Sequence, residues 1–161
     1  MAAGRTGNDT VQRFSAWRPP VPRETGFLPT SDGSRIYWET YGPASGLPML
    51  LTDGLACNGT FYVNQVPYFA RTRPVIRWAY RGHGLSDPPQ ATDSPDAQAE
   101  DLAALIKELK LVKPIVMGHS MGGFLTLRAM VISQDIKAGV IWAGVVGSYP
   151  DLLARWRRGG S

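Results

Sequence analysis

The sequence predicts an α/β fold in which a mostly parallel sheet follows an N-terminal antiparallel hairpin. After residue 46, short apolar runs alternate with stretches of helical pattern, which is typical of parallel strands joined by crossover helices. Asp32-Gly33 separates two segments rich in β-forming residues, and this pair indicates the hairpin. A glycine-rich corner around Ser120 directly follows one of the apolar runs, where a strand would pass into a helix.

The chain has 161 residues, enough for one domain with its own core. Residues 1–22 are polar and end in the proline-rich "RPPVP", so they predict a flexible N-terminal segment. Residues 23–161 are expected to form the folded domain. The composition, with 43% hydrophobic and 19% charged residues, argues against global disorder.

Six strands are expected in the order of the chain. The two arms of the hairpin supply the first two, and four apolar runs supply the others: "LPMLLTDG", "RPVIRWAY", "KPIVMG" and "IKAGVIWAGVV". Helices are expected for "NGTFYVNQVPYFAR", which Pro67 should bend or interrupt, for "MGGFLTLRAMVIS" and for "YPDLLARWRR".

The clearest helix begins after Ser94. The Ser94 side chain can cap the first turn, Pro95 suits the first helical position, and Asp96 complements the helix dipole. Helical spacing then places four apolar residues on one face: Leu102, Leu105, Ile106 and Leu109.

The composition also disfavours several classes of protein. The longest apolar run is shorter than the roughly 18 residues of a membrane span, and the N-terminus lacks the apolar core of a secretory signal. No membrane association is therefore expected. The single cysteine, Cys57, allows no intrachain disulfide, which suits a reducing compartment and predicts a cytoplasmic protein. The net charge is +4, and part of it lies in "RWRR". We interpret this stretch as a solvated helix face and not as a nucleic-acid site.

No metal or cofactor is expected from the sequence. Cysteine, histidine and carboxylate residues do not cluster with metal-ligand spacing. A nucleotide-binding domain is disfavoured because no G-x-G-x-x-G or Walker-type loop follows the early strands. Cys57 is interpreted as a small buried apolar group.

The motif "GHSMG" has the form G-x-S-x-G between a predicted strand and a predicted helix. In this context the turn lifts the Ser120 hydroxyl clear of the sheet. Gly118 and Gly122 are needed because a Cβ would meet neighbouring backbone, and Gly123 lets the helix approach the sheet. The Met121 peptide N–H, at the helix N-terminus, would be one donor to an oxyanion. A glycine-rich turn with an incidental serine is the alternative.

These segments resemble the N-terminal part of an α/β-hydrolase, most of all the esterase, lipase and haloperoxidase-type members. The resemblance covers about residues 25–147 and rests on the hairpin, the loop "YRGHGLSDPP" and the elbow "GHSMGG". The stretch "DIKAGVIWAGVVGSYPDLLARW" resembles the corresponding segment of prolyl-oligopeptidase-type serine peptidases.

The resemblance implies that Ser120 is the nucleophile and that the peptide N–H groups of Met121 and Leu55 form the oxyanion hole. Asp53 stands where the family usually has a histidine, a change that a backbone donor tolerates, and it is interpreted as a turn residue. His119 is expected to point away from the Ser120 hydroxyl. The residues that shape the nucleophile elbow are Gly118, His119, Gly122 and Gly123.

The usual partners of the nucleophile are missing from the sequence. A serine needs a general base, and in this fold the acid and then the histidine follow the serine along the chain. His83 and His119 both precede Ser120, and His83 is assigned to loop structure. The resemblance therefore predicts a hydrolase that is cut off after its sixth strand, with an incomplete triad. Such a chain would expose a sheet edge that favours self-association.

The function expected from the sequence is hydrolysis of ester or amide bonds through an acyl-enzyme on Ser120, weak or absent in this chain alone. The substrate would be a small-molecule ester or amide, or a peptide. The alternative is a non-catalytic fragment or pseudoenzyme that binds a ligand or a partner.

Overall fold

The computed structural model describes residues 20–57, 59–91 and 93–144, which form a six-stranded sheet with the order β1-β2-β4-β3-β5-β6. The strands β1 and β2 pair antiparallel, as do β2 and β4, whereas β3 pairs parallel with β4 and β5, and β5 with β6. The predicted fold class is confirmed. The strands are β1 (Glu24–Pro29), β2 (Arg35–Tyr41), β3 (Met49–Thr52), β4 (Val75–Ala79), β5 (Ile115–His119) and β6 (Ala138–Trp142).

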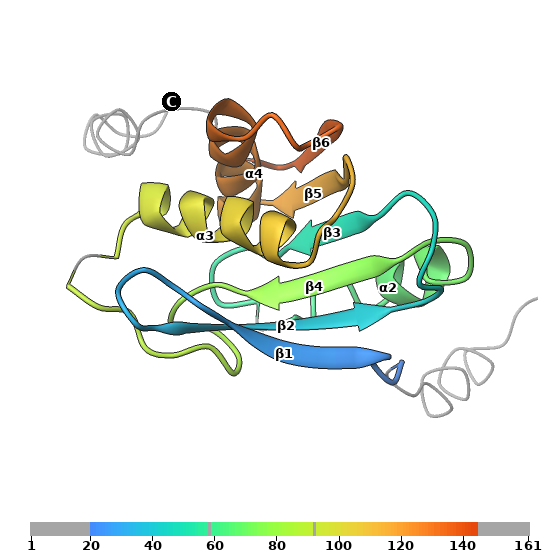
Figure 1. The fold of residues 1–161 in the computed structure, drawn as a ribbon, viewed down its shortest axis with the longest axis horizontal. Coiled ribbons are helices and arrows are strands. Elements are labelled where there is room, and N and C mark those ends of the chain that lie inside the picture. Colours follow the sequence, from blue (N-terminus) through green and yellow to red (C-terminus); the bar gives the residue numbers. More distant parts are fainter. Residues whose placement is uncertain (1–19, 58, 92, 145–161) are drawn as a thin grey trace, which may run out of the picture.

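Among the described residues, helices α2, α3 and α4 cover the two faces of the sheet (Figure 1). α3 (Pro95–Glu108) and α4 (Met121–Ile132) lie on one face, where their apolar side chains form the larger core cluster with β2, β3, β4 and β5. The short α2 (Gln65–Phe69) lies on the other face with a smaller cluster. The expected helix "YPDLLARWRR" and residues 1–19 of the N-terminal segment lie outside the described residues.

The hairpin turn between β1 and β2 is closed by local polar contacts. The Asp32 carboxylate accepts hydrogen bonds from the Thr30 hydroxyl at 2.7 Å and from the Ser34 N–H at 3.1 Å. These donors hold the pKa of Asp32 well below its ordinary value. Gly33 has φ +86°, which an L side chain adopts only with strain. Asp32-Gly33 therefore makes the turn that the sequence predicts.

The N-terminus of α3 has the predicted cap. The Ala97 N–H donates to Ser94 Oγ at 3.1 Å, and Pro95 occupies the first turn. Leu102, Leu105 and Ile106 are buried against the sheet, and Leu109 packs on the same cluster while partly buried. The same face also buries the polar residues Gln98 and Asp101.

The segment after β3 is less helical than the sequence predicts, and Pro67 is not the point at which a long helix bends or is interrupted. Turns occupy residues 61–64, and α2 then spans only Gln65–Phe69. Pro67 lies in the first turn of this helix, where a backbone N–H has no intrahelical partner in any case. The proline therefore falls inside the short helix and does not bend a longer one.

β6 is an edge strand of the described sheet. Val140 and Trp142 on this strand are exposed by 41% and 45%. Unpaired strand edges with apolar side chains favour association between chains. Self-association through this edge stays a prediction.

Candidate active site

Ser120 lies at the sharp corner between β5 and α4. Its backbone has φ 52° and ψ −118°, which is outside the regions that strands and right-handed helices occupy. Holding a non-glycine residue in such a conformation costs about 1–3 kcal/mol. The Ser120 N–H donates to the Trp142 carbonyl at 3.0 Å, and the Gly123 N–H donates to the Ser120 carbonyl at 3.0 Å. The corner is thus held from β6 on one side and from the first turn of α4 on the other.

Close packing around the corner explains its glycines. A Cβ on Gly122 would lie 2.5 Å from the Asp53 carbonyl oxygen, and a Cβ on Gly118 would lie 2.5 Å from Thr126 Oγ1. That hydroxyl already donates to the Gly122 carbonyl at 2.8 Å. A Cβ on Gly123 would lie 2.9 Å from the Gly144 Cα, which follows β6. The first turn of α4 therefore contacts the ends of β3 and β6 backbone to backbone.

The loop after β3 lies directly against Ser120. A Cβ on Gly54 would be 3.2 Å from Ser120 Cβ and 2.9 Å from His119 Nδ1. Within the described part of the chain, neither the Leu55 nor the Met121 peptide N–H donates a hydrogen bond. Gly54, which precedes Leu55 in the chain, thus lies close to Ser120, which precedes Met121.

The His119 ring turns toward aromatic neighbours. It stacks on Phe61 with centroids 3.7 Å apart and an interplanar angle of 13°, and it meets Trp142 edge-on at 6.1 Å. His119 Nδ1 is buried and has no hydrogen-bond partner among the described residues. The His119 side chain therefore packs between the loop after β3 and β6.

His83 is in contact with the loop after β3 and not with the serine. His83 Nε2 accepts a hydrogen bond from the Ala56 N–H at 2.9 Å, and Nδ1 lies 3.2 Å from the Arg81 carbonyl. Among the described residues, no side chain hydrogen-bonds to the Ser120 hydroxyl. Neither histidine is therefore placed as a base for Ser120 in this conformation.

Asp53 is a buried acid at the end of β3, with 7% of its surface exposed. Burial raises the pKa of its carboxyl, while Arg77 and the Gly59 N–H oppose that rise. Its Oδ1 has no hydrogen-bond partner among the described residues. Asp53 follows β3 directly before Gly54, as expected of a turn residue, and the sequence did not show that its carboxyl is buried.

Asp53→Asn is expected to stabilise the protein at neutral pH and to make little difference in acid. A buried carboxyl with a raised pKa contributes stability while it is protonated and loses it as the pH rises through the folded-state pKa. Asparagine stays neutral and can still accept from the Gly59 N–H. Urea unfolding of both proteins across the acid-to-neutral range measures the difference. A difference independent of pH would contradict this account.

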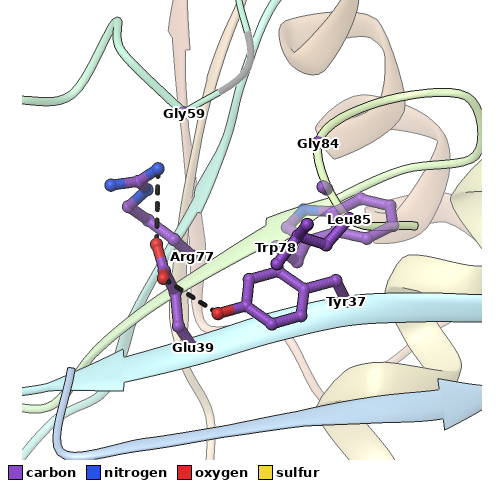
Figure 2. Close-up of a pocket in the computed structure, with 8 residues that line it drawn as sticks. Tyr37, Glu39, Gly59, Arg77, Trp78, Gly84 and Leu85 are labelled. Carbon is purple, nitrogen blue, oxygen red and sulfur yellow. Dashed lines mark hydrogen bonds and ion pairs between the residues drawn. The ribbon is translucent and has the colours of Figure 1, made fainter.

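A cavity of about 180 Å³ lies between β2, β4 and the loop residues Gly59 and Leu85 (Figure 2). Glu39 and Arg77 face each other across the strand pair and form an ion pair at 3.3 Å. The Tyr37 hydroxyl donates to Glu39 at 3.3 Å. The charges in this cavity compensate one another. The alternation in "RIYWETY" could have indicated that Tyr37 and Glu39 share a face, but not that Arg77 pairs with them.

Ranges 20–57, 59–91 and 93–144 contain no group of three or more histidine, cysteine or acidic residues arranged to hold a metal ion. No helix in these ranges is both long and apolar enough to cross a membrane.

Cys57, expected to be buried, is only partly buried, because the turn that carries it lies at the surface.

The order of the strands and the strand–serine–helix corner define this class of fold as that of the α/β hydrolases. The chain belongs to this family: the model of the alpha/beta hydrolase family matches residues 54–160.

Individual relatives agree with this assignment. The chain is 37% identical over 131 residues to a non-heme chloroperoxidase from Streptomyces lividans, which covers 81% of this chain and 47% of the relative. Among solved structures, a hydrolase from Pseudomonas aeruginosa superposes with a TM-score of 0.73 at 25% identity, covering 84% of this chain and 51% of that one. A thermophilic esterase from Thermogutta terrifontis gives a TM-score of 0.69 at 25% identity, covering 85% and 54%. The chain thus spans about half the length of these relatives.

Proposed function

We propose that this chain carries the nucleophile of a serine hydrolase that acts on ester or amide bonds. The observation that carries the proposal is the backbone of Ser120, held at φ 52° between a parallel strand and a helix N-terminus. Strain of this kind persists only where the surrounding structure enforces it, and it gathers at functional sites. The similarity to a hydrolase and an esterase supports the same chemistry.

In the proposed reaction Ser120 Oγ attacks the carbonyl carbon of the substrate, and the carbonyl oxygen becomes an oxyanion. The Met121 and Leu55 N–H groups, which are unused within the described residues, would donate to it. Collapse of the intermediate breaks the bond to the leaving oxygen or nitrogen, which gains the proton given up by Ser120 Oγ and departs as an alcohol or amine, and an acyl group stays on Ser120. Water then adds to the acyl carbon and releases the acid. The substrate class is a small-molecule ester or amide, or a peptide, and the single cysteine suits a cytoplasmic location.

A general base must remove the proton from the Ser120 hydroxyl. His83 Nε2 is already occupied by the Ala56 N–H, and the His119 ring stacks on Phe61. This observation favours a second candidate function, a non-catalytic hydrolase domain that binds a ligand or a partner. In either case we expect the chain by itself to react slowly.

The test is covalent labelling of the full chain with a fluorophosphonate, followed by intact mass. Attack by Ser120 Oγ on phosphorus forms an O–P bond and expels fluoride, so each active molecule gains one adduct. Ser120→Ala is expected to reduce labelling to background, whereas the exposed Ser31→Ala should label like the natural chain. Folding of all three proteins is checked by circular dichroism. If the folded natural chain takes no label, the catalytic proposal fails and the binding function remains.

A further inference from the structure

The loop that contacts Ser120 contains a strained turn. The Cys57 N–H donates to the Gly54 carbonyl at 3.2 Å, so Leu55 and Ala56 occupy the two central positions. Ala56 has φ 63°. Turns with positive φ at the third position favour glycine, and an alanine there costs about 1–2 kcal/mol. Rotation of the Leu55–Ala56 peptide would relieve this strain, so another group must hold the peptide in place.

His83 supplies the contact that holds this peptide. The Ala56 N–H donates to His83 Nε2 at 2.9 Å across 27 positions of sequence. Because the amide is the donor, Nε2 must carry no hydrogen, and the ring proton belongs on Nδ1. Nδ1 lies 3.2 Å from the Arg81 carbonyl, which can accept that proton. A neutral His83 ring with its proton on Nδ1 is therefore consistent with both contacts.

The imidazole is itself anchored to the core. Its ring centroid lies 4.1 Å from that of the buried Tyr80. The backbone amide of His83 donates to the Tyr80 carbonyl at 3.0 Å. The side chain of Arg81 is fixed by the buried Asp101, with a 2.8 Å hydrogen bond from Nε. The loop after β4 is thus a rigid support, from which His83 reaches the more exposed turn at Ala56.

We propose that His83 is a positioning residue for the oxyanion hole: its Nε2 holds the Leu55–Ala56 peptide, which fixes the Gly54–Cys57 turn and, through it, the preceding Gly54–Leu55 peptide whose N–H would face the oxyanion. This inference rests on the proposed function, in which that N–H is an oxyanion donor. The supporting geometry is the close approach of Gly54, the residue before Leu55, to Ser120: a Cβ added on Gly54 would lie 3.2 Å from Ser120 Cβ. Oxyanion donors are effective when they are fixed before the charge develops. His83 acts through the turn and does not touch the reacting atoms.

The first test needs no substitution. In the ¹⁵N-labelled natural chain at neutral pH, we expect the Nε2 of His83 to show the chemical shift of an unprotonated nitrogen. We also expect a through-hydrogen-bond ¹⁵N–¹⁵N coupling to the Ala56 amide. A hydrogen on Nε2 of the neutral ring, or no coupling from a well-resolved Ala56 amide, would overturn the proposal. This measurement does not depend on any reaction at Ser120.

The second test uses matched variants of the full chain. His83→Phe keeps an aromatic ring against Tyr80 but removes the acceptor, whereas His83→Gln can place an oxygen near the position of Nε2. We expect His83→Phe to slow fluorophosphonate labelling about 10- to 100-fold, as a displaced catalytic group does. His83→Gln should recover most of the rate. Ala56→Gly in the His83→Phe background should also recover it, because glycine adopts positive φ without strain.

The outcomes separate this inference from the proposed function. If the natural chain takes no label, the proposed function fails, and the coupling measurement alone decides whether His83 holds the turn. If the natural chain labels and folded His83→Phe labels equally fast, the positioning role is wrong. If His83→Phe labels slowly but neither Gln nor the added glycine restores the rate, His83 has only a structural effect and the proposal is also overturned.

Discussion

Arg81→Met is expected to lower the free energy of unfolding by about 3–5 kcal/mol. The Arg81 side chain is 3% exposed and donates to Asp101 at 2.8 and 3.1 Å, where the Asp101 side chain is 7% exposed. Arg81 also pairs with Asp32 of the hairpin turn. Methionine fills similar space but leaves the Asp101 carboxylate buried without a counter-charge, and this desolvated charge is the source of the loss.

Chemical unfolding in urea measures this effect, and two further variants test its cause. Arg128→Met removes an ion pair with Asp96 in which the side chains are 41% and 63% exposed, so we expect a change below about 1 kcal/mol. Arg81→Met combined with Asp101→Leu should be more stable than Arg81→Met alone, because the buried carboxylate at position 101 is gone and Asp32, whose side chain is 24% exposed, stays partly solvated. Equal losses for Arg81→Met and Arg128→Met would contradict the argument from burial.

Gly122→Ala is expected to destabilise the protein by at least about 3 kcal/mol or to prevent folding. Helix propensity alone predicts the opposite sign, since alanine is favoured over glycine inside a helix by about 1 kcal/mol. The added Cβ would lie 2.5 Å from the Asp53 carbonyl oxygen and would also overlap the Thr52 carbonyl. Both atoms belong to the backbone at the end of β3, a central strand of the described sheet, and cannot yield cheaply.

Gly33→Ala is the matched control for this prediction. Gly33 has φ +86°, but a Cβ there meets nothing within 4 Å. The substitution therefore carries only the cost of a left-handed backbone, about 1–2 kcal/mol. Thermal and urea unfolding of both variants compare the two costs. A Gly122→Ala protein at least as stable as the natural chain would show that the close approach of α4 to β3 is absent in solution.

The parts of the fold that could be predicted from the sequence are those fixed by neighbours in the chain. The turn at Asp32-Gly33 needs a short acceptor followed by a residue that tolerates positive φ, and both requirements are local. The cap at Ser94 is likewise a contact across three residues. The long helix expected after β3, with Pro67 bending or interrupting it, was wrong in extent, because the sequence did not show how short α2 is or that the proline would fall in its first turn.

The surroundings of the candidate site could not be predicted in the same way. Asp101 lies on the apolar face of α3, and a charge at such a position was a signal of a buried partner. Nothing local identified Arg81, which is 20 positions away. The contact of His83 with Ala56 joins the loops after β4 and β3, which are adjacent because these strands pair in the sheet.

The strand–serine–helix corner, the hairpin and the family resemblance can be recognised in the sequence because each depends on residue types at short, fixed spacing. What surrounds the corner depends instead on how distant segments pack together. Strands β4, β3 and β5 are adjacent and parallel, so the segments that follow them meet at the carboxyl ends of these strands. There the Asp53 carboxyl is buried, His119 stacks on Phe61 and His83 turns toward Ala56. Burial and hydrogen-bond partners arise where these distant segments meet. They therefore cannot be predicted from the spacing of residues along the chain.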